Sequence, residues 1–202
     1  MIAVFAKAPR PGEVKTRLAA AVGDECAAGL HRAFVADVLA TALTLGEPVE
    51  LHTDRPTDEW AGLPVVKRLQ VPGDLAARML HVLRTSAPVM IIGSDIPSVP
   101  AAHLRRLLDS PADLALGPTP DGGYWAIRAR RAPGETLFRN VEWSSGREFS
   151  QTAANAREDG LSVDIEAEWF DVDTVDDLRR LLAGPLPPHT ARFLRLFGPL
   201  RI

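Results

Sequence analysis

The sequence contains few of the residues that build disulfide frameworks and zinc sites. Only one of its 202 residues is a cysteine, Cys26, so no disulfide bond can form within the chain. The five histidines are widely spaced, and no two of them are four residues apart. We therefore expect neither a disulfide-stabilised fold nor zinc chemistry.

The sequence also lacks a strong net charge and a long apolar run. The formal net charge is -3, which does not favour nucleic acid or an anionic membrane as a partner. The apolar opening, residues 2–6, is short and is followed by Lys7 and Arg10, which is the wrong order for a signal peptide. Because no stretch approaches transmembrane length, we expect a cytoplasmic protein that binds neither nucleic acid nor membrane.

The composition is that of an ordinary globular protein. Hydrophobic residues make up 46% and charged residues 24% of the chain, and 202 residues suit one α/β domain. No internal repeat or linker divides the chain. After Gly184, three prolines precede an apolar segment. We predict one domain over residues 1–184 and a tail, residues 185–202, whose short amphipathic helix packs on it; a homodimer contact is the alternative.

Apolar, β-branched segments alternate with helical patterns along the chain. The predicted strands are residues 2–6, 49–53, 65–70, 89–93, 114–117, 124–128 and 163–169. The predicted helices are residues 24–45, 74–84 and 100–109, and two more that begin at the N-caps Ser145 and Thr174. This alternation predicts a mostly parallel sheet with helices on both faces. Since residues 114–128 leave no room for a helix, we expect a hairpin there and a mixed sheet.

A basic loop follows the first predicted strand. It carries Lys7, Arg10, Lys15 and Arg17 against Glu13 alone, a local charge of 4 − 1 = +3. Ligands of parallel sheets bind beyond the carboxyl ends of the strands, where this loop lies. It is thus suited to hold a di- or triphosphate through charge-assisted hydrogen bonds. The alternative is a solvated surface loop.

Two acidic positions follow later strands of the predicted sheet. Asp95 comes directly after the most apolar strand and suits Mg²⁺ or Mn²⁺, which takes one or two protein carboxylates. The alternative is a cap for the next helix, but Ser98 is also placed to be that cap and would leave Asp95 free. Asp173 follows the last strand and is either a second metal ligand or a charge at a helix N-terminus, and the same choice holds for Asp171.

The segment Asp121-Gly122-Gly123 precedes two aromatic residues. Such a sequence is a strong hairpin-turn signal. Two consecutive glycines also allow a substrate to lie against backbone amides. The sequence leaves both interpretations open.

Several motifs together resemble a known family. In chain order they are FAKAPRPGEVKTRLA (5–19), GDLAARM (73–79), GSDIP (93–97), GPTPDGGYWAI (117–127) and DVDTVDDL (171–178). Their order and spacing resemble the bacterial glycosyltransferase-A-like family of nucleotide-diphospho-sugar transferases, some members of which are linked to arsenosugar biosynthesis. The chain is more distantly similar to phospholactate and molybdenum-cofactor guanylyltransferases. The resemblance runs from residue 2 to about 182 and implies a single-domain, Rossmann-like glycosyltransferase-A fold.

The resemblance also implies roles for individual residues. It implies catalytic roles for Asp95, Asp121 and Lys15, and binding of Mg²⁺ or Mn²⁺ by Asp95 and Asp173. The implied nucleotide- and phosphate-binding residues are Lys7, Arg10, Lys15, Thr16, Arg17, Gln70, Gly73 and Asp74. The implied substrate-binding residues are Gly122, Gly123, Tyr124, Trp143 and Ser145. The chain departs from the family at Trp143-Ser144-Ser145, where members usually carry Trp-Gly-Thr.

Three functions fit these observations. The first is glycosyl transfer from a nucleoside-diphosphate sugar to a small-molecule acceptor. The second is transfer of a nucleoside monophosphate from a nucleoside triphosphate to a phosphorylated acceptor, which four loop cations suit somewhat better. Arg128, Arg130 and Arg131 can hold that acceptor or form a solvated strand end. The third is a nucleotide-binding protein without catalysis. The base, the sugar and the acceptor stay open.

Overall fold

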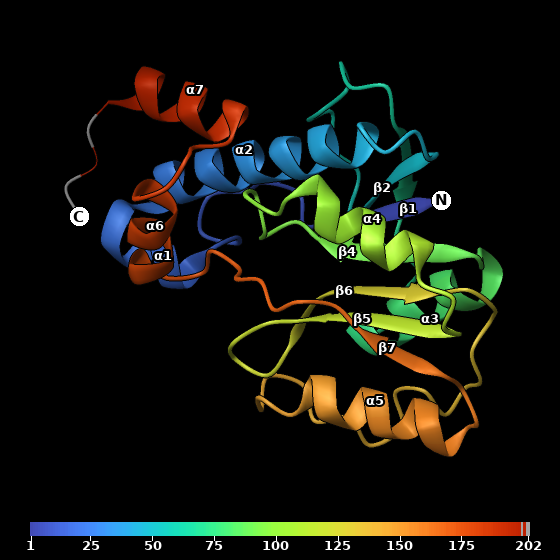
Figure 1. Ribbon diagram of the computed structural model, residues 1–202. Coiled ribbons are helices and arrows are strands. Elements are labelled where there is room, and N and C mark those ends of the chain that lie inside the picture. Colours follow the sequence, from blue (N-terminus) through green and yellow to red (C-terminus); the bar gives the residue numbers. More distant parts are fainter. Residues whose placement is uncertain (199, 201–202) are drawn as a thin grey trace.

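A seven-stranded sheet runs through the middle of the molecule in this computed structural model, which describes residues 1–198 and 200 (Figure 1). The strands are β1 (Ile2–Ala6), β2 (Val49–Thr53), β3 (Val66–Leu69), β4 (Val89–Gly93), β5 (Leu114–Pro118), β6 (Tyr124–Ala129) and β7 (Val163–Ile165). Their order across the sheet is β3-β2-β1-β4-β6-β5-β7. Only β6 is antiparallel to its neighbours, because it forms a hairpin with β5. The predicted mixed α/β sheet is confirmed.

Helices cover both faces of this sheet (Figure 1). They are α1 (Thr16–Val22), α2 (Asp24–Leu43), α3 (Leu75–Thr85), α4 (Ala101–Asp109), α5 (Glu148–Glu158), α6 (Val175–Leu182) and α7 (Pro188–Phe197). Helices α2 and α4 pack on one face, and α3 and α5 pack on the other. Helices α1 and α6 extend the core at one end of α2.

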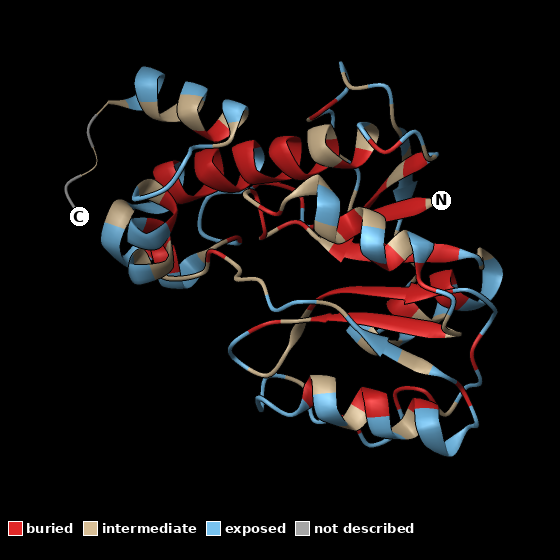
Figure 2. Ribbon diagram, viewed as in Figure 1, coloured by how far each residue is buried: buried red, intermediate tan, exposed pale blue. Residues whose placement is uncertain are grey.

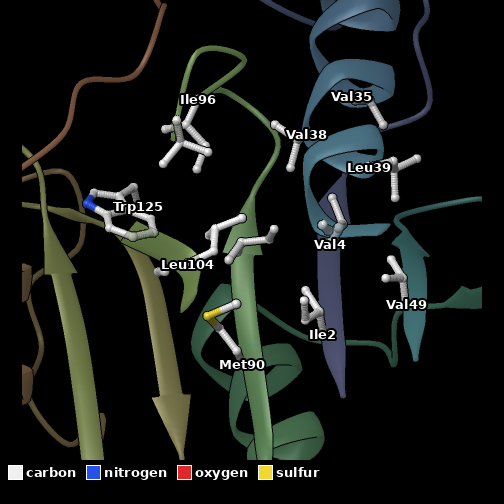
Figure 3. Packing of buried hydrophobic residues seen from close by; sticks show 14 of the residues in the cluster. Ile2, Val4, Val35, Val38, Leu39, Val49, Met90, Ile96, Leu104 and Trp125 are labelled. Carbon is white, nitrogen blue, oxygen red and sulfur yellow. The ribbon is translucent and has the colours of Figure 1, made fainter. Parts of the chain in front are cut away.

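The core on the α2 side is built from side chains that alternate along the central strands. Figure 3 shows Ile2 and Val4 of β1 facing Val38 and Leu39 of α2, with Met90 of β4 beside them. All five residues are fully buried. Each contributes roughly 2 kcal/mol of hydrophobic stabilisation. The layer fixes β1 and β4 side by side, and their carboxyl ends therefore meet at one edge of the sheet.

Helix α2 is an exception to the expectation that no segment approaches transmembrane length. Its 20 residues are long and apolar enough by composition to cross a membrane. However, 78% of the apolar window is buried inside the fold, and Figure 2 shows the helix largely in the buried colour. We therefore interpret α2 as the central core helix.

Helix capping inferred from the sequence is confirmed for one helix and wrong for two others. Helix α6 begins at the predicted N-cap Thr174 with a full capping box. Helix α5 instead begins at Glu148 with Arg147 as its N-cap, although the side chain of Glu148 accepts the backbone N–H of Ser145 as in a capping box. The predicted cap Ser98 is also wrong: Pro100 precedes α4, and the hydroxyl of Ser98 has no hydrogen-bond partner among the described residues.

Two other elements differ from the predicted bounds. Helix α1 is not predicted, because the sequence after the first strand has the composition of one continuous basic loop. Strand β7 ends at Ile165 rather than at residue 169, and the chain then crosses to α6 as an irregular segment. That segment brings Asp171 and Asp173 toward the edge where β1 and β4 end.

Helix α7 lies along α2 on the side away from the sheet (Figure 1). The buried carboxylate of Asp37, in the middle of α2, accepts the backbone N–H groups of His189 and Thr190 and the hydroxyl of Thr190 at 2.7–2.8 Å. Asp37 therefore acts as a cap for the N-terminus of α7 from a neighbouring helix.

Candidate active site

The loop after β1, the end of β4 and the segment before α6 converge on one ammonium group. The Lys15 Nζ atom lies 2.7 Å from a carboxylate oxygen of Asp95 and 2.7 Å from one of Asp173. It also donates to the backbone carbonyl of Val172 at 2.7 Å. The side chain of Lys15 is only 3% exposed, whereas those of Asp95 and Asp173 are 40% and 36% exposed. The two carboxylates therefore face an open cavity and share one buried cation.

The backbone of Lys15 is strained in the way that functional loops often are. Its φ of 49° and ψ of 40° place it in the left-handed region, which a residue with a long side chain seldom adopts. This conformation begins α1 and turns the side chain under the loop. The loop thus adopts an unfavourable backbone conformation that places one ammonium group between two acids.

The electrostatics of this group favour its charged form. Burial alone would lower the pKa of Lys15, but the carboxylates of Asp95 and Asp173 outweigh burial and raise it. Burial alone would likewise raise the pKa of Asp95, but Lys15 and His31 outweigh burial and lower it. Lys15 and Asp95 are thus an ion pair.

His31 of α2 lies beside the same carboxylate, and the sequence does not indicate it as a site residue. Its Nε2 atom lies 3.0 Å from the carbonyl oxygen of Lys7, and its Nδ1 atom lies 3.7 Å from Asp95. The side chain is 5% exposed. A histidine in the interior of an apolar helix reads as a core residue, and only the packing of α2 under the loop shows its proximity to Asp95.

A cavity of about 500 Å³ opens above these groups, and we call it the donor cavity. Of the predicted nucleotide-binding residues, it is lined by Lys7, Lys15, Thr16, Arg17 and Gln70. Asp95, Asp173 and His31 line it as well. Its lining therefore combines loop cations with the two carboxylates.

Three of the predicted nucleotide-binding residues lie outside the donor cavity lining. Arg10 is exposed and lies 4.0 Å from Glu13. Asp74 is the N-cap of α3, where it accepts the N–H of Ala77. Gly73 precedes it, and its carbonyl accepts the guanidinium of Arg78.

Arg78 also lines the donor cavity, and the sequence does not indicate it as a site residue. It also donates to the side-chain carbonyl of Gln70 at 3.0 Å. Gln70 directly follows β3, whereas Arg78 lies in α3. No local sequence pattern therefore marks Arg78.

A second cavity of about 560 Å³ adjoins the first, and we call it the acceptor cavity. Five residues line both cavities, and Arg17 and Asp173 are the charged ones among them. The predicted residues Asp121, Gly123, Tyr124 and Trp143 line the acceptor cavity. Ser145 does not line it, whereas its neighbours Ser144 and Gly146 do. Ser144 has a φ of 60°, a left-handed conformation that suits the glycine usual at this position in the resembled family.

The predicted residue Gly122 lies outside the lining of the acceptor cavity but packs against Gly146, which lines it. Its φ is +86°, and a Cβ atom there would lie 1.9 Å from the carbonyl oxygen of Gly146. Its carbonyl accepts the N–H of Phe149. The loop between β5 and β6 is therefore packed against the start of α5 and is more than a hairpin turn.

Asp171 adds an unpaired acid to the acceptor cavity. Burial raises its pKa to about 6, and repulsion by Asp173 and Asp121 adds to the shift. Among residues 1–198 and 200, it forms no ion pair. The sequence predicted Asp171 as either a second metal ligand or a charge at a helix N-terminus, and it gave no sign that Asp171 lines the acceptor cavity.

The three arginines near the end of β6 lie at the opposite edge of the sheet. Arg128 donates to the backbone carbonyls of Ser110 and Ala112, and Arg131 pairs with Asp113 at 2.8 Å. Because β6 is antiparallel, its carboxyl end points away from the carboxyl ends of β1 and β4. The suggestion that they hold an acceptor is therefore wrong.

The carboxylates of Asp95 and Asp173 fit a hard divalent cation. Each of them places an oxygen next to the same positive charge, the ammonium of Lys15. Within the described part of the chain, no group of three or more acidic, histidine or cysteine side chains gathers closely enough to hold a metal alone. This donor set matches Mg²⁺ or Mn²⁺, which completes its shell with phosphate oxygens and water.

The chain is similar to several known proteins. Residues 49–145 match the family described as "uncharacterized protein conserved in bacteria (DUF2064)". The chain is 30% identical to 2-phospho-L-lactate guanylyltransferase of Methanocella arvoryzae over 174 residues, 83% of this chain and 74% of that protein. It is 31% identical to phosphoenolpyruvate guanylyltransferase of Streptomyces avermitilis over 191 residues, 88% of this chain and 86% of the relative.

A solved structure is also similar over nearly the whole fold. A protein of Desulfovibrio desulfuricans G20, described as a nucleotide-diphospho-sugar transferase, superposes with a TM-score of 0.82 at 32% identity. The match covers 89% of this chain and 84% of that one. These relatives are transferases, so the non-catalytic alternative loses its support. The chain therefore belongs to the glycosyltransferase-A-like family of nucleotide-dependent transferases that its motifs indicated, and it is a transferase enzyme.

Proposed function

We propose that this protein is a metal-dependent nucleotidyltransferase, which transfers a nucleoside monophosphate from a nucleoside triphosphate to a phosphorylated small molecule. The observation that carries the proposal is the pair of carboxylates, Asp95 and Asp173, joined by Lys15 at the floor of a cavity that loop cations line. Two curated relatives are named as guanylyltransferases, so GTP is the first donor to test.

The donor cavity supplies the contacts that such a transfer needs. Lys7, Lys15 and Arg17 neutralise the negative charge of the triphosphate. An oxygen of the acceptor phosphate attacks the α-phosphorus, and the bond from that phosphorus to the bridging oxygen breaks. Pyrophosphate leaves with the bonding electron pair, and the loop cations stabilise the charge that develops on it.

The metal ligands of the proposal are Asp95 and Asp173. A bound Mg²⁺ or Mn²⁺ supplies Lewis-acid polarisation of phosphate oxygens. Lys15 keeps both carboxylates in place between the loop and the strand end. His31 orients Asp95 and the loop backbone together.

Glycosyl transfer from a nucleoside-diphosphate sugar is the second candidate. It is favoured by the similarity to the Desulfovibrio protein described as a nucleotide-diphospho-sugar transferase. The same loop cations would then stabilise a departing nucleoside diphosphate, and Asp121 would position the acceptor hydroxyl. The leaving group distinguishes the two reactions.

A donor screen tests the proposal. Purified protein is titrated with the four nucleoside triphosphates and with nucleotide sugars, with Mg²⁺, Mn²⁺ or a chelator, and thermal stabilisation is recorded. Pyrophosphate and nucleoside diphosphate release are then measured with phosphorylated acceptors. We expect metal-dependent stabilisation by a triphosphate and release of pyrophosphate. Preference for a nucleotide sugar with release of nucleoside diphosphate would establish the second candidate instead.

Two matched variants locate the reaction. Asp95→Asn keeps the size of the side chain but removes its charge, and it should lower turnover by roughly a hundredfold or more. Asp109→Asn alters an exposed acid at the opposite edge of the sheet and should leave turnover unchanged. Equal turnover in the two variants would refute the site.

A further inference from the structure

The acceptor cavity has an unusual charge for an enzyme whose acceptor is a phosphate. Its lining includes four carboxylates and, among the described residues, one cation, Arg17. The acids are Asp121, Glu148, Asp171 and Asp173. Asp173 is neutralised by Lys15, but the other three form no ion pair within residues 1–198 and 200. The cavity is therefore negative apart from its junction with the donor cavity.

Arg17 stands at that junction, since it lines both cavities. It takes part in no ion pair within the described part of the chain. A phosphate group attacking the donor must lie at this boundary, and Arg17 is placed to pair with it. The rest of the acceptor must then lie deeper, against the three acids that form no ion pair within the described residues.

The lining of the cavity also includes aromatic rings. The rings of Tyr124 and Trp143 line it, with their centroids 6.4 Å apart in an edge-to-face arrangement. Aromatic faces and carboxylates are the two groups that proteins use to bind an ammonium ion. A second carboxylate on the acceptor would instead meet like charges in a partly enclosed space.

The relatives' names specify acceptors of the opposite kind. Phospholactate and phosphoenolpyruvate each carry a carboxylate beside the phosphate. A cavity for such an acceptor calls for a second cationic group. The arginine cluster near β6, which includes Arg128 and Arg131, lies at the far edge of the sheet, where Arg128 bonds to backbone carbonyls and Arg131 pairs with Asp113.

We infer that the acceptor is a phosphate monoester whose organic part bears an ammonium group, and this inference rests on the proposed function. The ammonium group binds between Asp121, Asp171 and the rings of Tyr124 and Trp143. Arg17 holds the phosphate, and the acids select the organic part. The specificity of this chain thus differs from that of the guanylyltransferases to which it is similar.

A matched pair of small phosphates tests the inference by binding alone. Phosphoethanolamine and phosphoglycolate have nearly the same size and differ in carrying an ammonium or a carboxylate group. Their affinities for the full-length protein with Mg²⁺ are measured by isothermal titration calorimetry, and ethyl phosphate gives the reference with neither group. We expect phosphoethanolamine to bind at least about tenfold more tightly than phosphoglycolate, a difference of about 1.4 kcal/mol.

Two variants assign the preference to the cavity. Asp171→Asn and Asp121→Asn should each reduce the ratio of the two affinities by about threefold or more, whereas the control Asp109→Asn should leave it unchanged. Arg17→Ala should weaken both phosphates alike, because it removes their common contact.

The outcomes separate this inference from the proposed function. Equal or tighter binding of phosphoglycolate, binding of neither compound, or an unchanged ratio in both acidic variants would overturn the inference, even if pyrophosphate release is observed. Conversely, the expected preference without pyrophosphate release from any triphosphate would support the selective cavity and reject nucleotidyl transfer.

Discussion

Lys15 and Asp95 lie 80 positions apart in the chain, yet the ammonium of one is 2.7 Å from the carboxylate of the other. The pair joins the loop after β1 to the end of β4, and Asp173 extends it to the segment before α6. Three separate stretches of chain therefore share a single positive charge. Each of them also lines the donor cavity, so the stability of this contact and the shape of the site are coupled.

Replacing Lys15 with methionine should destabilise the protein and change its response to metal. The variant leaves two acids facing each other without their cation, which we expect to cost about 2 kcal/mol after allowance for their partial exposure. Chemical denaturation in a chelator measures this loss. Added Mg²⁺ should raise the melting temperature of the variant more than that of the wild type, because the ion replaces the missing charge.

The conservative variant serves as the control for that prediction. Lys15→Arg keeps a positive charge but lacks the compact ammonium that fits between Asp95 and Asp173. It should recover part of the stability and little of the nucleotide binding. A methionine variant as stable as the wild type in chelator would contradict the coupling.

The loop between β5 and β6 should tolerate no side chain at Gly122. Gly122→Ala places a Cβ atom against the carbonyl of Gly146 in a backbone conformation that favours glycine. We expect a loss of about 2 kcal/mol and weaker binding of the acceptor phosphates, with donor binding retained. Gly46→Ala is a useful control, because Gly46 also has a positive φ but has open space around it. Similar losses of acceptor affinity in both variants would show a general effect of stability.

The sequence predicts the sheet and the position of the site better than it predicts the contacts. A buried apolar strand such as residues 89–93 places whatever follows it at the sheet edge, so Asp95 is found from pattern alone. In the sequence, Lys15 is one of several loop cations. Only the structure shows that its backbone is left-handed and its side chain is buried. His31 and Arg78 act through packing between distant elements, and no spacing rule reveals them.

The capping prediction for Ser145 failed for a related reason. Ser145 and Glu148 have the spacing of a capping box, and the Glu148 contact to the Ser145 N–H is present. Gly122, however, packs against Gly146, and residues 143–146 form a turn there. Helix α5 therefore starts later. The close approach of two glycines overrides the local signal.

The stability of the protein without metal should depend on the protonation of Asp171. Its pKa in the folded state is about 6, above the usual value, so folding favours the protonated acid. Stability is thus greatest below the unfolded pKa, near 4, and falls as the pH rises toward 6. Asp171→Asn should remove this loss and be more stable than the wild type by about 1 kcal/mol at pH 8, with allowance for partial exposure.

Urea denaturation at pH 4.5 and pH 8 in a chelator measures that dependence. These two pH values are chosen to bracket the titration. The gain of Asp171→Asn over the wild type should be large at the higher value and small at the lower one. The variant Asp109→Asn should show no such growing gain, since its acid is exposed at the end of α4. A gain that is constant with pH would place the cause outside the titration of Asp171.

The attachment of α7 to the domain should depend on Asp37. Thr190→Val removes one of the three donors to this buried carboxylate and should cost about 1–2 kcal/mol, while Asp37→Ala removes all three contacts and should cost more. Limited proteolysis should then cut between α6 and α7 faster than in the wild type. His189→Ala is the matched control, because His189 donates to Asp37 only through its backbone N–H. If Thr190→Val and His189→Ala are cut at the same rate, the hydroxyl contact does not hold α7, and the apolar packing of Phe193 against α2 does so instead.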